Sequence, residues 1–147
     1  MTKELVYLVQ TDTTAGFLSK SDEKLAHLKQ RSKDQKTLQT LDSFTTLKYN
    51  TRIPNKFKRF VRRSNKTTFI YPNKKAFRVI DPNDKHHKFI QKFSTMYSTS
   101  ANKTKEKFNL DFALNNADIT VEDKYNFRCT ESSQIVLLST QKMCCIR

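Results

Sequence analysis

Glycine is almost absent from this sequence, in which Gly16 is the one glycine among 147 residues. A P-loop or a G-x-G-x-x-G dinucleotide fingerprint needs several backbone positions without a Cβ close to the phosphates. Both motifs are therefore excluded. We expect that any bound nucleotide is held by side chains rather than by a glycine-rich loop.

Cysteine is also scarce and has no metal-binding pattern. The three cysteines, Cys129, Cys144 and Cys145, form no C-x-x-C spacing and leave an odd count. We expect reduced, structural thiols rather than a metal or redox centre. The three histidines form no H-x-x-H or H-E-x-x-H pattern, so we expect no metal site made by the protein.

Long apolar runs are missing. A run such as Ile135 to Leu138 is far too short to span a bilayer, and the N-terminus has no basic region followed by an apolar one. We therefore expect a soluble, cytoplasmic protein with no membrane partner.

Acidic residues are outnumbered two to one. The chain has 28 Lys and Arg against 14 Asp and Glu, a formal net charge of +14. Such a field attracts nucleotides or RNA. The alternative is a general abundance of lysine, which also occurs in plain loops such as 102–105 and needs no RNA partner. The most basic stretch, 54–63, has the same two interpretations, a tRNA-binding surface or the solvated face of a helix, and we favour the helix.

Two polar stretches are the most informative features. Residues 29–34 carry three cations directly after an amphipathic helical run, and the five uncharged residues 98–102 include three small hydroxyl side chains and one amide. Lys29 and Arg31 would point apart on a regular helix, so a turn is needed there for both to reach one ligand. Together the two stretches predict an anion pocket.

The remaining pattern alternates strands with helices. Predicted strands cover 4–9, 37–41, 67–71, 76–80, 118–121, 133–138 and 141–146, and predicted helices cover 21–31, 42–47, 54–63, 81–93 and 106–114. The length fits one domain over residues 1–147. Interspersed strands and helices that end in consecutive strands predict the α/β class, an open α/β sandwich with a mixed sheet.

Several segments, in the same order along the chain, resemble motifs of the YrdC-type family of threonylcarbamoyl-AMP synthases. They are Thr11-Asp12-Thr13 for P-T-D-T, Leu28-Lys29-Gln30-Arg31 for L-K-x-R, Thr68 to Pro72 for the strand after a P-G-P turn, Phe77-Arg78-Val79 for V-R-V, Ser98 to Asn102 for S-T-S-A-N, and Ser133 for the start of P-S-T-V-V. Ser64-Asn65-Lys66 stands in the place of the P-G-P turn, and Gln10 in that of the proline in P-T-D-T.

This resemblance implies a twisted mixed sheet flanked by helices, and an activity. The activity is L-threonylcarbamoyladenylate synthesis from L-threonine, bicarbonate and ATP, for the threonylcarbamoyladenosine modification of tRNA. ATP is then a substrate, with Mg²⁺ carried by its triphosphate. Further partners are tRNA or the tRNA-modification proteins that use the adenylate.

The resemblance also implies roles for individual residues. Expected catalytic and nucleotide-binding residues are Lys29, Arg31, Ser100 and Asn102, with Ser133 as a further nucleotide contact. Expected threonine-binding residues are Thr11, Thr13, Arg78 and Ser98, with Arg78 on the threonine carboxylate.

Two alternatives stay open because the P-G-P turn is absent. One is a non-catalytic RNA-binding module of the same fold. The other is a divergent paralogue that acts on another carbamoyl compound.

Overall fold

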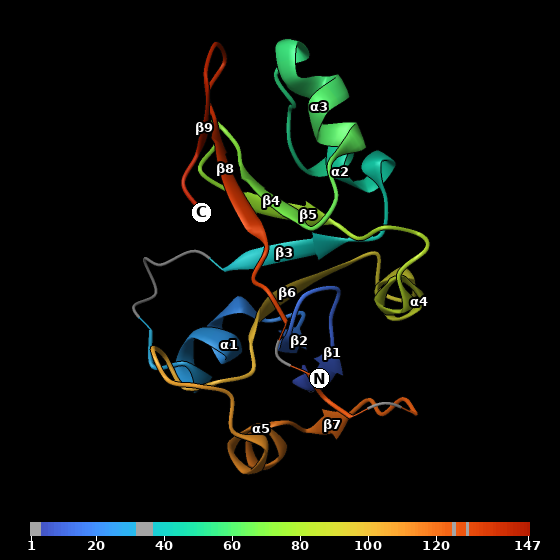
Figure 1. Ribbon diagram of the computed structural model, residues 1–147, viewed down its shortest axis with the longest axis vertical. Helices are drawn as coiled ribbons and strands as arrows, with labels where there is room; N and C mark the ends of the chain where they lie inside the picture. The colour runs from blue at the N-terminus through green and yellow to red at the C-terminus, as the bar shows by residue number, and fades with distance from the viewer. Residues whose placement is uncertain (1–3, 32–36, 125, 129) are drawn as a thin grey trace. The chain divides into compact units, whose positions relative to one another are not determined.

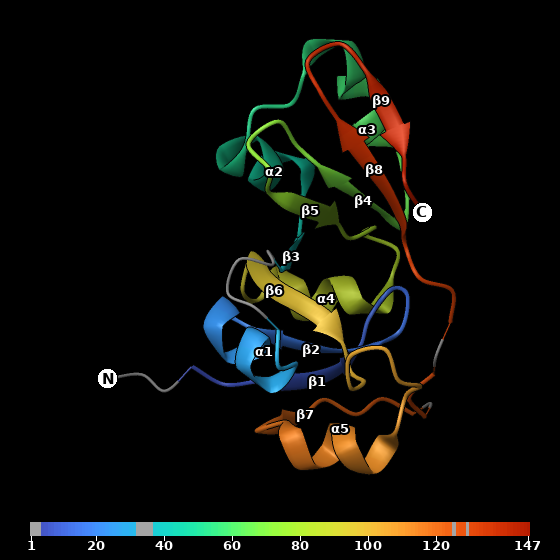
Figure 2. The same cartoon turned by 90° about the vertical axis from the view of Figure 1, so that its left-hand side faces the viewer.

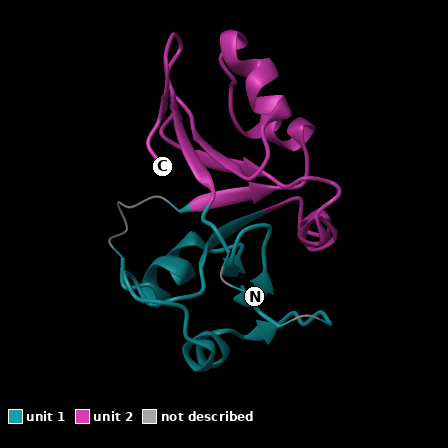
Figure 3. Cartoon of the chain, viewed as in Figure 1, with its two compact units in different colours: residues 1–37, 96–132 teal, residues 38–95, 133–147 magenta. Residues whose placement is uncertain are grey.

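The chain folds into two compact units, each built from two separate segments. The computed structural model describes residues 4–31, 37–124, 126–128 and 130–147. Unit 1 comprises Met1–Thr37 and Met96–Ser132, and unit 2 comprises Leu38–Thr95 and Ser133–Arg147 (Figure 3). The chain therefore passes three times from one unit to the other.

Unit 1 has a mixed sheet in the strand order β7-β1-β2-β6 (Figure 1). Its elements are β1 (Tyr7–Gln10), β2 (Ala15–Ser19), α1 (Asp22–Leu28), β6 (Thr95–Ser100), α5 (Leu110–Asn116) and β7 (Ile119–Thr120). β1 pairs antiparallel with β2 and parallel with β7, and β2 pairs antiparallel with β6. A four-residue connection, 11–14, therefore closes a β1–β2 hairpin.

The core of unit 1 lies where α1 and α5 cover one face of this sheet. Leu8 and Phe17 from the strands cluster with Leu25 of α1 and Ala113 of α5, and all four are fully buried. Ser21 begins α1 as its N-cap, because its side chain accepts a hydrogen bond from the Lys24 backbone N–H. Figure 2 shows α1 alongside β1 and β2.

The strands of unit 2 follow the order β3-β5-β4-β8-β9, again with mixed parallel and antiparallel pairing. Its elements are β3 (Leu38–Leu41), α2 (Phe44–Asn50), the 3₁₀ helix η1 (Asn55–Phe57), α3 (Lys58–Arg63), β4 (Thr67–Ile70), β5 (Ala76–Val79), α4 (Lys85–Gln91), β8 (Gln134–Leu138) and β9 (Met143–Cys145). β3–β5 and β4–β8 are parallel pairs, whereas β4–β5 and β8–β9 are antiparallel.

The two faces of the unit 2 sheet differ in chemistry. On one face Phe69 and Phe77 lie in register and pack with Leu47 of α2, Phe57 of η1 and Val61 of α3. Side chains alternate along a strand, so the neighbours of these phenylalanines point to the other face. That face carries a row of buried polar residues, which are Thr40, Thr68 and Arg78.

The expected α/β class, with a mixed sheet flanked by helices, is confirmed. The predicted helix over 81–93 begins later, at Lys85, because the Asp81 carboxylate accepts a hydrogen bond from the Asn83 N–H and folds 81–84 into a turn. Asp84 then caps α4. Strand β2 was not predicted, nor was the stretch 98–100 recognised as part of strand β6. The single domain over 1–147 stays a prediction.

Two further expectations concern thiols and membranes. Cys144 and Cys145 are free, as expected, but both are exposed on β9 instead of contributing to a core, and Cys129 lies outside the described residues. Within the described residues, no helix has both the length and the apolar character needed to cross a membrane.

Candidate functional site

The end of α1 has the turn that the two cations need. Lys29 is the C-cap of the helix, and Gln30 adopts a left-handed backbone conformation with φ of 54°. The Gln30 N–H donates to His27 O at 3.1 Å, and the Arg31 N–H donates to Ala26 O at 2.9 Å. These two bonds form a Schellman motif, which ends the helix and reverses the chain.

The turn directs both cations to the end of β6 and the residues that follow it. Lys29 Nζ donates to Ser100 O at 3.0 Å, to Asn102 Oδ1 at 3.2 Å and also to Asn102 O. Ser100 Oγ lies 3.5 Å from the same ammonium group. Arg31 Nη2 donates to Thr99 Oγ1 at 3.1 Å. The structure therefore brings Lys29, Ser100 and Asn102 together, with Arg31 on the adjacent residue of β6.

The two cations differ in exposure. Lys29 is buried, with 6% of its surface exposed, and Arg31 is half-buried. Burial, and secondarily the charge of Arg31, lowers the pKa of Lys29 from 10.5 to about 8. Burial also lowers the pKa of Arg31, an effect that the nearby Asp22 carboxylate opposes. Arg31 Nε and Asp22 Oδ1 are both buried without a hydrogen-bond partner among the described residues. The acceptors around Lys29 Nζ are all neutral oxygens, which accept its hydrogen bonds without neutralising its charge, so the site favours an anionic ligand.

Hydroxyl groups lie on the sheet face opposite α1. Gly16 is in register with Ser100, and Leu18 with the buried Ser98. A Cβ on Gly16 would lie 2.9 Å from Thr11 Cγ2 and 3.1 Å from Thr99 O, so the single glycine lets the turn after β1 approach β6. Thr11, Ser98 and Ser100 therefore share this face.

The hydroxyls of Thr11 and Thr13 also shape that turn. Their Oγ1 atoms lie 3.3 Å apart, and Thr11 Oγ1 donates to Thr14 O at 2.5 Å. Both threonines are buried. Thr11 Oγ1 also accepts a hydrogen bond from the Thr13 N–H at 3.2 Å, so the backbone of the turn holds this hydroxyl in one orientation.

The other two predicted site residues belong to unit 2. Arg78 is buried on β5, in register with Thr40 of β3. Ser133 lies just before β8, and its Oγ is 3.0 Å from Thr68 Oγ1. The structure places Arg78 and the Thr68–Ser133 pair on the polar face of the unit 2 sheet. Residues 32–34 of the basic stretch lie outside the described residues.

Three threonines at these positions were absent from the predicted site. Thr99 accepts from Arg31, Thr68 pairs with Ser133, and Thr40 lies beside Arg78. Strand alternation is a usable signal for Thr40 and Thr68, because each directly precedes an apolar residue in a short β-rich run and so points to the opposite face. Thr99 carried no such signal.

The predicted site residues include no acidic cluster for a metal ion. Within the described residues, no three His, Cys, Asp or Glu side chains gather closely enough to hold one. The oxygen atoms at the Lys29 site that could face a metal ion are neutral carbonyl, hydroxyl and amide oxygens, and they lie beside the positive charge of Lys29.

Comparison with known proteins gives structural but not sequence matches. No protein-family model matches the chain, and no curated protein matches it. Among solved structures, a doubly substituted Sua5 from P. abyssi is 15% identical, with a TM-score of 0.78 over 97% of this chain and 52% of that one. Sua5 from P. abyssi complexed with L-threonine gives 15% identity and a TM-score of 0.75, over 97% of this chain and 50% of that one.

YciO from E. coli is similar to the chain at 13% identity and a TM-score of 0.72, over 98% of this chain and 82% of that one. Sua5 and YciO have the YrdC/Sua5 fold, so the fold implied by the motif resemblance is confirmed. The chain spans about half the length of the two Sua5 structures.

Proposed function

We propose, on the premise of a YrdC/Sua5 fold, that the chain makes L-threonylcarbamoyladenylate from L-threonine, bicarbonate and ATP. The observation that carries this proposal is the convergence of Lys29 and Arg31 on residues 99–102, where a buried and a half-buried cation meet hydroxyl and amide groups. The chemistry requires a site that gathers anions, and the residue types of this cluster support such a role.

The reaction needs positioning more than acid–base chemistry. The threonine amine forms a C–N bond to bicarbonate with loss of water, which gives a carbamate. A carbamate oxygen then bonds to the α-phosphorus of ATP, and the bond from that phosphorus to the pyrophosphate oxygen breaks. Lys29 and Arg31 would stabilise the charge on the phosphate and carbamate oxygens. Mg²⁺ would arrive bound to the triphosphate.

Threonine would be held by predicted residues of unit 1, because the hydroxyls of Thr11, Thr13 and Ser98 would contact its polar groups. The pairing of Arg78, in unit 2, with the threonine carboxylate stays a prediction from the resemblance. Support comes from the fold shared with a Sua5 structure that contains L-threonine. A buried polar partner for the threonine hydroxyl would give strong selection against amino acids that lack it.

The test is direct synthesis. The protein is incubated with labelled bicarbonate, L-threonine and ATP, and the adenylate and pyrophosphate are measured, with L-threonine omitted as the control. Isothermal titration with threonine and with ATP runs in parallel. Binding of both with adenylate formation supports the proposal.

Other outcomes would replace it. Binding of ATP without threonine-dependent adenylate would indicate a paralogue that uses another carbamoyl compound. Binding of neither compound would leave a module without this chemistry.

A further inference from the structure

The positive charge of the chain is concentrated in unit 2. The segments 38–95 and 133–147 hold 16 Lys and Arg but only three Asp and Glu, whereas the segments of unit 1 hold 12 and 11. Unit 2 thus has a formal charge of +13 out of +14. The stretch 43–80 has eleven cations and no acidic residue. A general abundance of lysine does not produce such a division.

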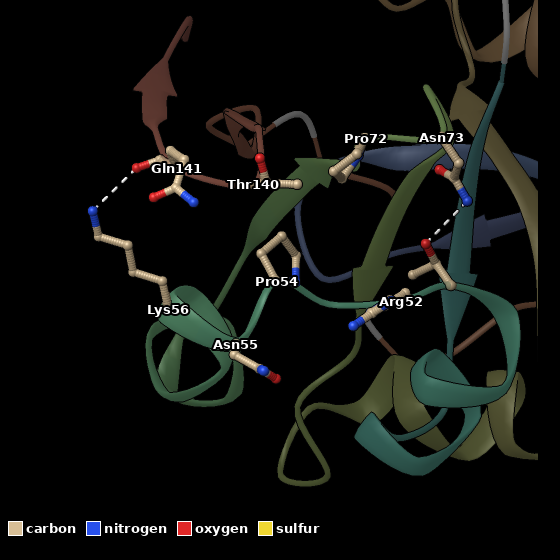
Figure 4. A pocket seen from close by; sticks show the side chains of 9 residues that line it. Arg52, Pro54, Asn55, Lys56, Pro72, Asn73, Thr140 and Gln141 are labelled. Atoms are coloured by element: carbon tan, nitrogen blue, oxygen red, sulfur yellow. Dashed lines mark hydrogen bonds between the residues drawn. The ribbon is translucent and has the colours of Figure 1, made fainter.

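Two hollows open on this basic unit and share residues. The larger, about 660 Å³, lies between the loop after α2 and the turns β4–β5 and β8–β9 (Figure 4). The smaller, about 500 Å³, is lined by the end of α2, the same loop and the start of α3. Thr51, Arg52 and Asn55 line both, so the two hollows are adjacent. Among the described residues, no Asp or Glu lines either hollow.

The rim of the larger hollow is fixed by two hydrogen bonds. Lys56 Nζ donates to Gln141 O at 3.1 Å, and Asn73 Nδ2 donates to Thr51 Oγ1 at 3.0 Å. These bonds tie three loops together, as the sticks in Figure 4 show. The lining is therefore organised before any ligand arrives, which reduces the entropy that binding costs.

The smaller hollow presents an aromatic ring among cations. Tyr49 is 88% exposed, although a large aromatic side chain normally buries most of its area. Lys48, Arg52 and Lys58 line the same hollow. An exposed ring flanked by cations is the arrangement on which nucleic-acid bases stack while their phosphates are neutralised.

We propose that these two hollows, the 48–58 groove, bind a single-stranded nucleic acid. Tyr49 would stack a base, Lys48, Arg52, Lys56 and Lys58 would neutralise phosphates, and the amides of Asn55 and Asn73 would contact sugar or base edges. A chain of phosphates matches cations spread across two adjacent hollows better than a single phosphate does, and better than a flat anionic membrane. This groove lies in unit 2 and does not depend on the adenylate chemistry.

The test is fluorescence anisotropy of the full chain with a fluorescein-labelled single-stranded RNA of about twelve nucleotides, measured over a range of salt concentrations. If four cations contact phosphates, the logarithm of the association constant is expected to fall with the logarithm of the salt concentration with a slope of about −3. DNA of the same sequence forms a second arm. Binding of either strand supports the proposal, and tighter binding of RNA identifies it as the ligand through its 2′-hydroxyls.

Variants separate stacking from charge. Tyr49→Ala is expected to weaken binding about 5- to 150-fold with an unchanged salt slope, and Tyr49→Phe to retain binding. Arg52→Ala with Lys58→Ala is expected to make the slope shallower by about 1.4. Lys88→Ala with Lys92→Ala removes the same charge from α4, which lines neither hollow, and is the matched control.

Three results would overturn the proposal. They are unchanged binding in Tyr49→Ala, an equal loss in the α4 control, and tighter binding to phosphatidylserine vesicles than to either strand. Melting temperatures identify any variant that fails to fold, and Lys29→Ala should leave RNA binding unchanged. Loss of adenylate synthesis and loss of RNA binding are therefore distinguishable.

Discussion

Lys29 is the side chain on which the proposed chemistry depends most. Lys29→Ala removes a charge-assisted contact of about 1.5 to 3 kcal/mol, so adenylate synthesis should fall by roughly one to two decades. Asn102→Ala should cost somewhat less. The double variant should lose less than the sum, because both side chains act on one ligand. Strict additivity, or unchanged activity in either single variant, would contradict the shared site.

The burial of Lys29 also predicts a pH dependence of stability. Its pKa is about 8 in the folded protein, against 10.5 for an ordinary lysine. The unfolded chain therefore holds more protons between these values, and the free energy of unfolding should rise with pH across that window, while the cost of burying the charge is fully present below it.

Urea denaturation of the wild type and of Lys29→Arg, at about pH 7 and about pH 9.5, tests this dependence. The stability of the wild type relative to the variant should increase at the higher pH, because the guanidinium stays protonated. A pH-independent difference would mean that Lys29 is well hydrated.

Single residues also show how far sequence reasoning reaches. The motif order singled out Lys29 and Asn102, but their contact joins positions 73 apart, which no local pattern encodes. Gln30 is the other example. The left-handed turn after a helix is usually occupied by glycine, so glutamine gave no signal for the reversal that orients Arg31. The roles of these residues in catalysis stay predictions.

The end of α1 is the element whose geometry matters most. Gln30→Val places a β-branched residue at φ of 54° and should destabilise the protein by about 1–2 kcal/mol. Adenylate synthesis should also fall, since Arg31 leaves Thr99. Gln30→Gly accepts this conformation and is the matched control. Urea denaturation and adenylate-synthesis assays of both variants are the measurement. Equal stability and equal activity of Gln30→Val and Gln30→Gly would show that neither property depends on the left-handed turn at residue 30.

The β1–β2 hairpin depends on close approach at Gly16. Gly16→Ala should destabilise the protein by about 1–3 kcal/mol, because the new Cβ meets Thr11 Cγ2 and the Thr99 carbonyl. Thr11→Ser removes that methyl group, so the alanine should cost less in this background. A double-mutant cycle by denaturation measures the coupling. The same cost in both backgrounds would assign the strain to the carbonyl alone.

Among helices and strands, sequence patterns predicted the elements whose ends are marked by local residues. The helix that begins after Ser21 and the hairpin of β4 and β5 were predicted, because caps and turn residues mark them. The hairpin of β1 and β2 was missed because 11–14 was interpreted as a binding segment rather than as a turn. The buried Thr11 hydroxyl stabilises this turn, because it donates to Thr14 O.

The division of the whole molecule into two units was not visible in the sequence. Unit 1 joins two segments that residues 38–95 separate in the sequence. The amino-acid composition of the whole chain therefore averages over both units. The overall charge was predicted to attract nucleotides or RNA, but its concentration in unit 2 appears only once the units are known.

A further prediction concerns the basic helix α3 of unit 2. Arg59→Ala with Arg62→Ala should leave adenylate synthesis within a few-fold of the wild type, because both side chains are exposed and Arg62 packs over the Phe44 ring at 5.5 Å. Rates measured beside Lys29→Ala provide the comparison. A loss as large as that of Lys29→Ala would place α3 in the site.

The three passages between units have a consequence for the nascent chain on the ribosome. Strand β2 ends at Ser19, but its partner β6 ends at Ser100. At about 5–20 residues per second, the hairpin therefore waits roughly 4–16 seconds for that partner to be synthesised. β4 of unit 2 in turn lacks its partner β8 until Leu138 has been added. Each strand edge stays unpaired until its partner has been synthesised, so it needs protection from other chains in that interval.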